Sequence, residues 1–108
     1  MDYGNRRDGA PKGKGFFGEL KRPDGSVSTE ISVGVGIDGK EMEIPLIVPS
    51  LNKKELNYLL NSDVESKSFF QNMPPSIMDK AYEHATTRMK IGKSPFADES
   101  EVAKPPTK

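Results

Sequence analysis

Apolar or β-branched side chains recur at every second position on both sides of Asp38-Gly39, and the positions between them are mostly polar or glycine. Alternation with a period of two predicts strands that bury one face, and Asp-Gly is a favoured pair for a two-residue hairpin loop. A shift of one residue would set apolar side chains against the polar set, so the pattern and the turn together predict one register. The pairs expected on the apolar face are Val35 and Met42, Val33 and Ile44, Ile31 and Leu46, and Thr29 and Val48.

A further strand is expected before this hairpin, over residues 16–21, followed by a turn at residues 22–26 that contains Pro23, Asp24 and Gly25. Two loop lengths are open. A four-residue loop places Phe16 and Leu20 on the apolar face, whereas a three-residue loop places Phe17 there. The first is favoured because it buries Leu20. Pro45 cannot donate a hydrogen bond, so its strand is expected at the edge of the sheet.

Two helices are expected after the strands. The first begins with Asn52 as its N-cap and Glu55 as the reciprocal partner, and runs to about residue 61. Residues 62–73 are ambiguous. The second helix is expected to start with Ser76 as its cap and to end at Gly92. Its expected buried positions are Met78, Ala81, Tyr82, Ala85 and Met89.

The order of elements favours an α+β fold, namely a three-stranded antiparallel β-meander followed by two helices that pack on one face of it. Residues 15–96 are expected to form this single domain. Residues 1–14 are expected to be a flexible basic arm, and residues 97–108 a flexible tail, because neither end holds an apolar cluster.

Composition narrows the function classes. The 108 residues carry 16 basic and 16 acidic side chains, which is not the strongly basic footprint of a nucleic-acid-binding protein. There is no cysteine, so disulfides and sulfur-based zinc sites are excluded. No apolar run approaches the ~20 residues of a membrane span, and residues 1–15 lack the apolar segment of a secretory signal.

No arrangement of residues predicts catalysis, a cofactor or a metal site. Residues 13–18 match the pattern G-x-G-x-x-G, but a dinucleotide site needs a strand before it and a helix after it. Residues 92–94 resemble the end of a phosphate-binding loop, but such a loop stands at the start of a helix, whereas these residues stand at the end of one. His84 is the only histidine, is expected to face water, and has no nucleophile in a suitable pattern. The chain is therefore expected not to be an enzyme.

Two features favour binding to a partner. Ser32, Gly34 and Gly36 line the polar sheet face with little side-chain bulk, which suits close approach of another chain. The arm carries a second, basic group of candidate residues. These are Arg6, Arg7, Lys12 and Lys14.

Several segments together resemble a small module of tailed-bacteriophage virion and DNA-ejection proteins. They are residues 15–25, 29–35, 37–45, 48–51 and 88–96. The resemblance implies no catalytic residue. It implies a non-enzymatic structural or accessory virion protein that docks on other phage proteins, located in the virion and in the host cytoplasm during assembly. Homo-oligomer formation is open. Two alternatives are a phage-encoded inhibitor of a host factor and nucleic-acid binding through the basic arm.

Overall fold

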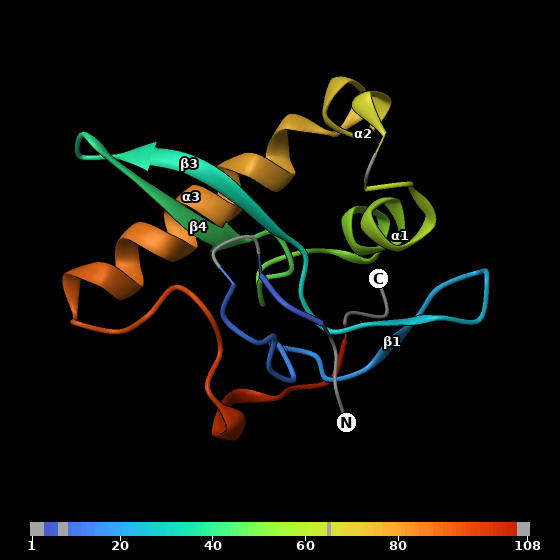
Figure 1. Cartoon of the computed structure of the whole chain (residues 1–108), viewed down its shortest axis with the longest axis horizontal. Helices are drawn as coiled ribbons and strands as arrows, with labels where there is room; N and C mark the ends of the chain where they lie inside the picture. The colour runs from blue at the N-terminus through green and yellow to red at the C-terminus, as the bar shows by residue number, and fades with distance from the viewer. Residues whose placement is uncertain (1–3, 7–8, 65, 106–108) are drawn as a thin grey trace.

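The polypeptide forms two separate antiparallel hairpins and three α-helices in a computed structural model that describes residues 4–6, 9–64 and 66–105 (Figure 1). β1 (Leu20–Lys21) pairs with β2 (Val27–Ser28), and β3 (Ser32–Ile37) pairs with β4 (Lys40–Pro45). The helices are α1 (Lys53–Asn61), α2 (Lys67–Asn72) and α3 (Pro75–Lys90), and a short 3-10 helix, η1 (Glu99–Glu101), follows. The α+β class is confirmed.

The β3–β4 hairpin has the register that the alternation predicts. Val35 is opposite Met42 and Val33 is opposite Ile44, and the Leu46 amide donates to the Ile31 carbonyl at 2.7 Å. Asp38 and Gly39 both have positive φ, 51° and 77°. Positive φ at both central positions gives the turn the twist of the strands that it joins.

The expected three-stranded meander is wrong, because β1 and β2 form a sheet of their own. Residues 13–15 occupy the place beside residues 29–30 where the first strand was expected to continue the pairing. The Thr29 hydroxyl donates to the Gly13 carbonyl at 2.6 Å, and the Gly13 amide donates to Glu30 at 2.9 Å. Leu20 is opposite Ser28 and Lys21 is opposite Val27, and the Arg22 amide donates to the Ser26 carbonyl at 2.9 Å, so Pro23, Asp24 and Gly25 form a three-residue loop and the favoured four-residue loop is wrong. Both Phe16 and Phe17 are buried.

α1 starts as predicted. The Asn52 side chain accepts from the Glu55 amide, and the Glu55 carboxylate accepts from the Asn52 amide, both at 2.8 Å. Leu51 and Leu56 flank this cap and are buried, as in a hydrophobic staple. This cap fixes the direction in which the chain enters the core from β4.

α3 lies against the β3–β4 hairpin, which crosses in front of it in Figure 1. Ala81 and Ala85 are buried as expected, and Met78 and Met89 are partly buried against the core. The expectation is wrong for Tyr82, which is exposed, and it missed Ile77, which is buried. Ser76 is not the cap either. The cap position is Pro74 and the helix begins at Pro75, two residues earlier than expected, because proline fits the first helical position without losing a hydrogen bond.

The apolar core lies between the hairpin and the helices. Ile44, Leu46, Leu59 and Ile77 are completely shielded from solvent. At roughly 25 cal/mol per Å² of apolar surface removed from water, side chains of this size contribute most of the favourable free energy of folding. The core therefore holds the β3–β4 hairpin with one face inward and the other outward.

Candidate interaction surface

The outer face of the β3–β4 hairpin brings together the three predicted partner-binding residues of the sheet. Gly34 and Gly36 are exposed, and a Cβ atom added to either would meet no other atom within 4 Å. Ser32 is half-buried on the same face. We call Ser32, Gly34, Gly36 and the facing Glu41 and Glu43 the outer face. Among the described residues, neither a close contact nor a positive φ requires glycine at positions 34 and 36.

Glu43 contributes an unpaired acceptor to this outer face. Its side chain is opposite Gly34, and its Oε2 atom is shielded from solvent with no hydrogen-bond partner among the described residues. A buried carboxylate oxygen without a donor is costly. Because this atom is shielded, a donor from another molecule reaches it only when the surrounding groups move aside.

A shallow hollow of about 640 Å³ lies beside Glu43. Residues of the hairpin, the N-terminal arm and the C-terminal segment line it. They are Arg6, Gly34, Glu41, Met42, Glu43, Ser94, Pro95 and Phe96. The hollow thus offers carboxylates and one guanidinium group on a largely open surface.

The basic residues of the arm do not act as one group. Arg6 forms a two-pronged ion pair with the buried carboxylate of Glu30, at 2.7 and 2.9 Å, and its guanidinium lies 3.9 Å from the centre of the Phe96 ring. Lys14 is exposed, and Lys12 lines a different hollow. Arg7 lies outside the described residues. Glu30 therefore neutralises the charge that Arg6 would otherwise offer to nucleic acid.

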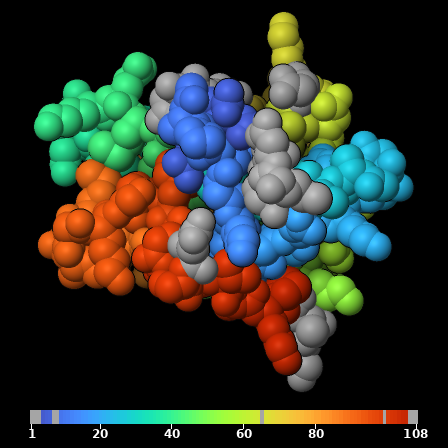
Figure 2. All heavy atoms as spheres, turned by 60° about the horizontal axis from the view of Figure 1, so that its bottom comes forward, coloured from blue at the N-terminus to red at the C-terminus, as the bar shows by residue number. Residues whose placement is uncertain are grey.

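Figure 2 shows the described part of the arm, in blue, on the surface between the two hairpins and above the C-terminal segment. The Arg6–Glu30 pair and the Gly13 contacts hold it there. The flexibility of residues 1–14 stays a prediction, and the Arg6–Glu30 pair is the contact that such motion would break.

The glycines of the G-x-G-x-x-G pattern have a packing role. Gly15 has φ +71°, and a Cβ atom at this position would lie 2.0 Å from the Thr29 carbonyl oxygen. Strand β1 follows the pattern, where a dinucleotide site would need a helix. Close approach of two backbone segments accounts for Gly15.

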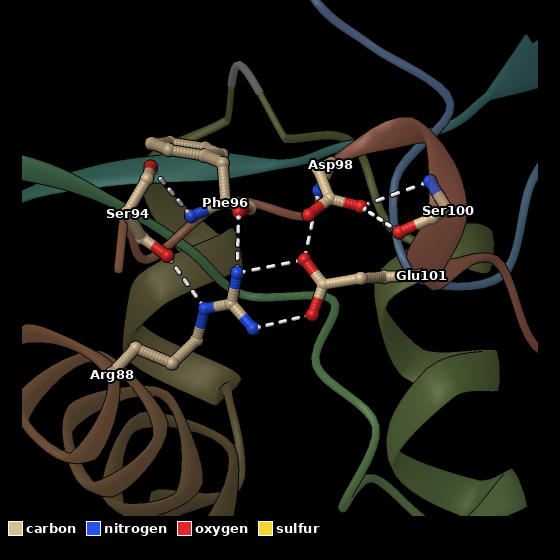
Figure 3. Close-up of polar contacts among 6 residues, drawn as sticks. All are labelled: Arg88, Ser94, Phe96, Asp98, Ser100 and Glu101. Carbon is tan, nitrogen blue, oxygen red and sulfur yellow. Dashed lines mark hydrogen bonds and ion pairs between the residues drawn. The ribbon is translucent and has the colours of Figure 1, made fainter. Parts of the chain in front are cut away.

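An Arg88–Glu101 ion pair ties the C-terminal segment to α3 (Figure 3). The Arg88 guanidinium donates to both oxygens of Glu101, at 2.6 and 2.8 Å, and to the carbonyls of Ser94 and Phe96. Hydrogen bonding from Arg88, together with the Asp98 amide, lowers the pKa of Glu101 to about 2. This pair was not predicted, because nothing in the spacing of Arg88 and Glu101 along the sequence indicates it.

His84 does not face water as expected. Its ring is half-buried and meets the Phe16 ring edge to face, with the ring centres 4.7 Å apart. Its Nε2 atom is shielded and has no partner among the described residues. Burial, and then the nearby Arg88 charge, lower the pKa of His84, although the Pro95 backbone and Glu101 oppose this. The ring therefore packs as a neutral group.

A second hollow, of about 560 Å³, lies between the β1–β2 hairpin and the end of α1. Arg22 lines it and donates to the Ser62 carbonyl at 2.6 Å and to the Leu59 carbonyl at 3.5 Å. These carbonyls belong to the C-terminal end of α1, where a cation is favourable. Stabilising this helix end accounts for Arg22.

Neither a group of three or more potential metal ligands nor a helix long and apolar enough to cross a bilayer occurs in the described part of the chain. Comparison with protein-family models, curated proteins and solved structures finds no match.

Proposed function

We propose that this protein is a non-enzymatic structural or accessory component of a tailed-phage virion, and that it docks on another phage protein through the outer face. The exposed Gly34 and Gly36, which have open space at their Cβ positions and are opposite Glu43 and Glu41, are the observation that supports docking most directly. The phage setting rests on the resemblance of about residues 15–97 to modules of virion proteins.

The chemistry of the outer face defines the partner's surface. Gly34 and Gly36 let another backbone or a flat side chain approach the strand closely. Glu41 and Glu43 accept hydrogen bonds, so the partner brings lysine, arginine or amide donors to this place. Charge-assisted hydrogen bonds of this kind are roughly twice as strong as neutral ones.

Mass spectrometry of purified particles from the phage that encodes this chain tests the assignment. The expected result is a fixed stoichiometry in the particle or in an assembly intermediate. Absence from both would overturn the virion assignment. A single stoichiometric partner in lysate of uninfected host cells would favour the inhibitor function instead.

A pair of charge-matched variants tests the surface. Glu43→Lys changes the outer face, and Glu83→Lys makes the same change at an exposed position of α3. The first variant is expected to reduce incorporation about tenfold, which corresponds to about 1.4 kcal/mol of binding free energy, and the second to leave it unchanged. Equal incorporation of folded Glu43→Lys and wild type would place docking elsewhere.

A further inference from the structure

The outer edge of β3 carries backbone groups that have no partner in the described part of the chain. The Leu46–Ile31 hydrogen bond fixes which pairs of the ladder are bonded, because bonded and non-bonded pairs alternate in antiparallel strands. The residues at positions 33, 35 and 37 therefore bond to β4. The amides and carbonyls of Ser32, Gly34 and Gly36 point away from β4, and no strand of the described residues lies beside them (Figure 1).

The two edges of this hairpin differ. On the outer edge of β4, Pro45 has no amide hydrogen and is itself buried by the rest of the chain, and Glu41 and Glu43 are charged. Proline and charged residues are the usual devices that keep an edge strand from pairing with another chain. β3 has neither a proline nor a charged residue over Ser32–Ile37, so one edge is protected and the other is open.

We propose that a second copy of this chain pairs with β3 across this open edge, antiparallel and about a two-fold axis at Gly34. In this register Gly34 meets Gly34 of the other copy, and Ser32 meets Gly36. Every outward amide and carbonyl of the strand then finds a partner. Val33 of one copy stands beside Val35 of the other on the inner face, so the apolar sides of both hairpins join.

Electrostatics favour a second copy over a charged partner at this edge. The facing strands carry no charge, and the formal net charge of the whole chain is zero. Glu41 and Glu43 lie on β4, so three strand spacings of about 4.8 Å would separate the two β4 strands. That is about 14 Å, beyond the screening length of ~8 Å at physiological salt.

The proposal is independent of docking through the outer face, because it uses the strand edge and not the side of the sheet. It predicts a four-stranded sheet with the glycines of both copies at its centre. The contact is one short strand pair, and interfaces below ~1,200 Å² belong to weak complexes. The dimer is therefore expected at high protein concentration.

Sedimentation of the full chain over a range of concentrations, combined with amide hydrogen exchange, tests this pairing. A reversible dimer is expected, and at concentrations where it dominates the Gly34 and Gly36 amides are expected to exchange about tenfold more slowly than in dilute solution. The Glu41 and Glu43 amides, on the protected edge, serve as the internal control and stay fast. A protein that remains monomeric, or a dimer whose Gly34 and Gly36 amides stay fast, would overturn the proposal.

Variants at Gly34 provide a second readout. Gly34→Pro removes an outward amide and leaves the β3–β4 ladder bonds in place, so dimer affinity is expected to fall about tenfold or more. Gly34→Ala keeps the amide and adds a methyl group in open space, so the dimer is expected to persist. If Gly34→Pro folds and dimerises like Gly34→Ala, the edge is not the interface. If Gly34→Pro does not fold, the exchange of the wild-type amides decides.

Discussion

Gly15 packs so closely against Thr29 that a Cβ atom at position 15 would lie 2.0 Å from the Thr29 carbonyl oxygen. Its φ of +71° adds a second constraint, because the backbone of a residue other than glycine is strained at this angle. This contact joins the arm to the segment between β2 and β3, and it is where the chain departs from the expected three-stranded sheet.

Gly15→Ala is expected to destabilise the protein by about 3 kcal/mol, since the clash with the Thr29 backbone adds to a conformational cost of about 1–2 kcal/mol. Urea unfolding measures the difference. Gly25→Ala is the matched control, because Gly25 also has positive φ but open space at its Cβ position. Gly25→Ala should lose only the conformational cost of about 1–2 kcal/mol in unfolding free energy. Equal losses in the two variants would contradict the close contact.

Ile44 anchors the inner face of the hairpin, with none of its surface exposed. Ile44→Ala is expected to cost about 3 kcal/mol, because it leaves a cavity in the core, and Ile44→Asp to abolish cooperative unfolding. Val27→Asp, at a position that is 41% exposed, is the control and should unfold much as wild type does. A cooperative, unshifted transition for Ile44→Asp would mean that the apolar face is not buried.

Glu55 connects the start of α1 to α3 through a buried carboxylate. It accepts from Ser76 Oγ at 2.5 Å and from Lys80 Nζ at 2.6 Å, besides the Asn52 amide. Burial alone would raise the pKa of Glu55, but hydrogen bonds from Lys80, Ser76 and Asn52 together lower it.

Glu55→Ala is expected to cost about 3 kcal/mol, because it leaves several donors without an acceptor, and Glu55→Gln less, because the amide oxygen still accepts. Denaturant unfolding measures both. Lys54→Ala, at the exposed neighbouring position, should change stability by less than about 0.5 kcal/mol. A loss in Glu55→Ala no larger than in Lys54→Ala would show that the network adds nothing.

The hairpin register and the start of α1 could be predicted because local sequence determines them. The Asp38-Gly39 turn and the period-two pattern act over a few residues, as does the Asn52–Glu55 cap. The end of α3 is similar, where the Gly92 and Lys93 amides donate back to the Met89 and Arg88 carbonyls.

The separation of the strands into two hairpins could not be predicted, because it depends on contacts between residues that are distant in sequence. Glu30 looked like a polar sheet residue, yet it is 2% exposed and holds Arg6. Periodicity records which side chains are apolar and not which charge is buried with which partner. The ion pair between Arg88 and Glu101 could not be predicted for the same reason, because it forms only when the chain folds back after α3.

The Arg88–Glu101 pair gives stability a dependence on pH in the acid range. The pKa of Glu101 is about 2 in the folded protein and near 4.5 in the unfolded chain. Its contribution is therefore complete above about pH 5 and is lost as pH falls from 4.5 towards 2. Glu101→Gln is expected to be less stable than wild type by about 1 kcal/mol at pH 7, and equally stable near pH 2.

Unfolding of wild type and Glu101→Gln at both pH values measures this convergence. Glu83→Gln, on an exposed position of α3, is the control and should follow wild type throughout. A constant gap between Glu101→Gln and wild type from pH 7 to pH 2 would contradict the ion pair.

His84 produces a second pH dependence, in a different range and from a different cause. Burial, with Arg88 nearby, lowers the pKa of His84 below its usual 6.5, so the unfolded chain takes up a proton first as pH falls. Stability is therefore unaffected well above pH 6.5 and decreases as pH falls from there to the folded-state pKa.

His84→Phe keeps an aromatic ring beside Phe16 but cannot titrate, so its unfolding free energy should stay level from pH 7.5 to about pH 5.5. Thr87→His places a histidine at an exposed position of α3 and should leave the wild-type slope unchanged. A wild-type slope that persists in His84→Phe would mean that another group titrates in this range.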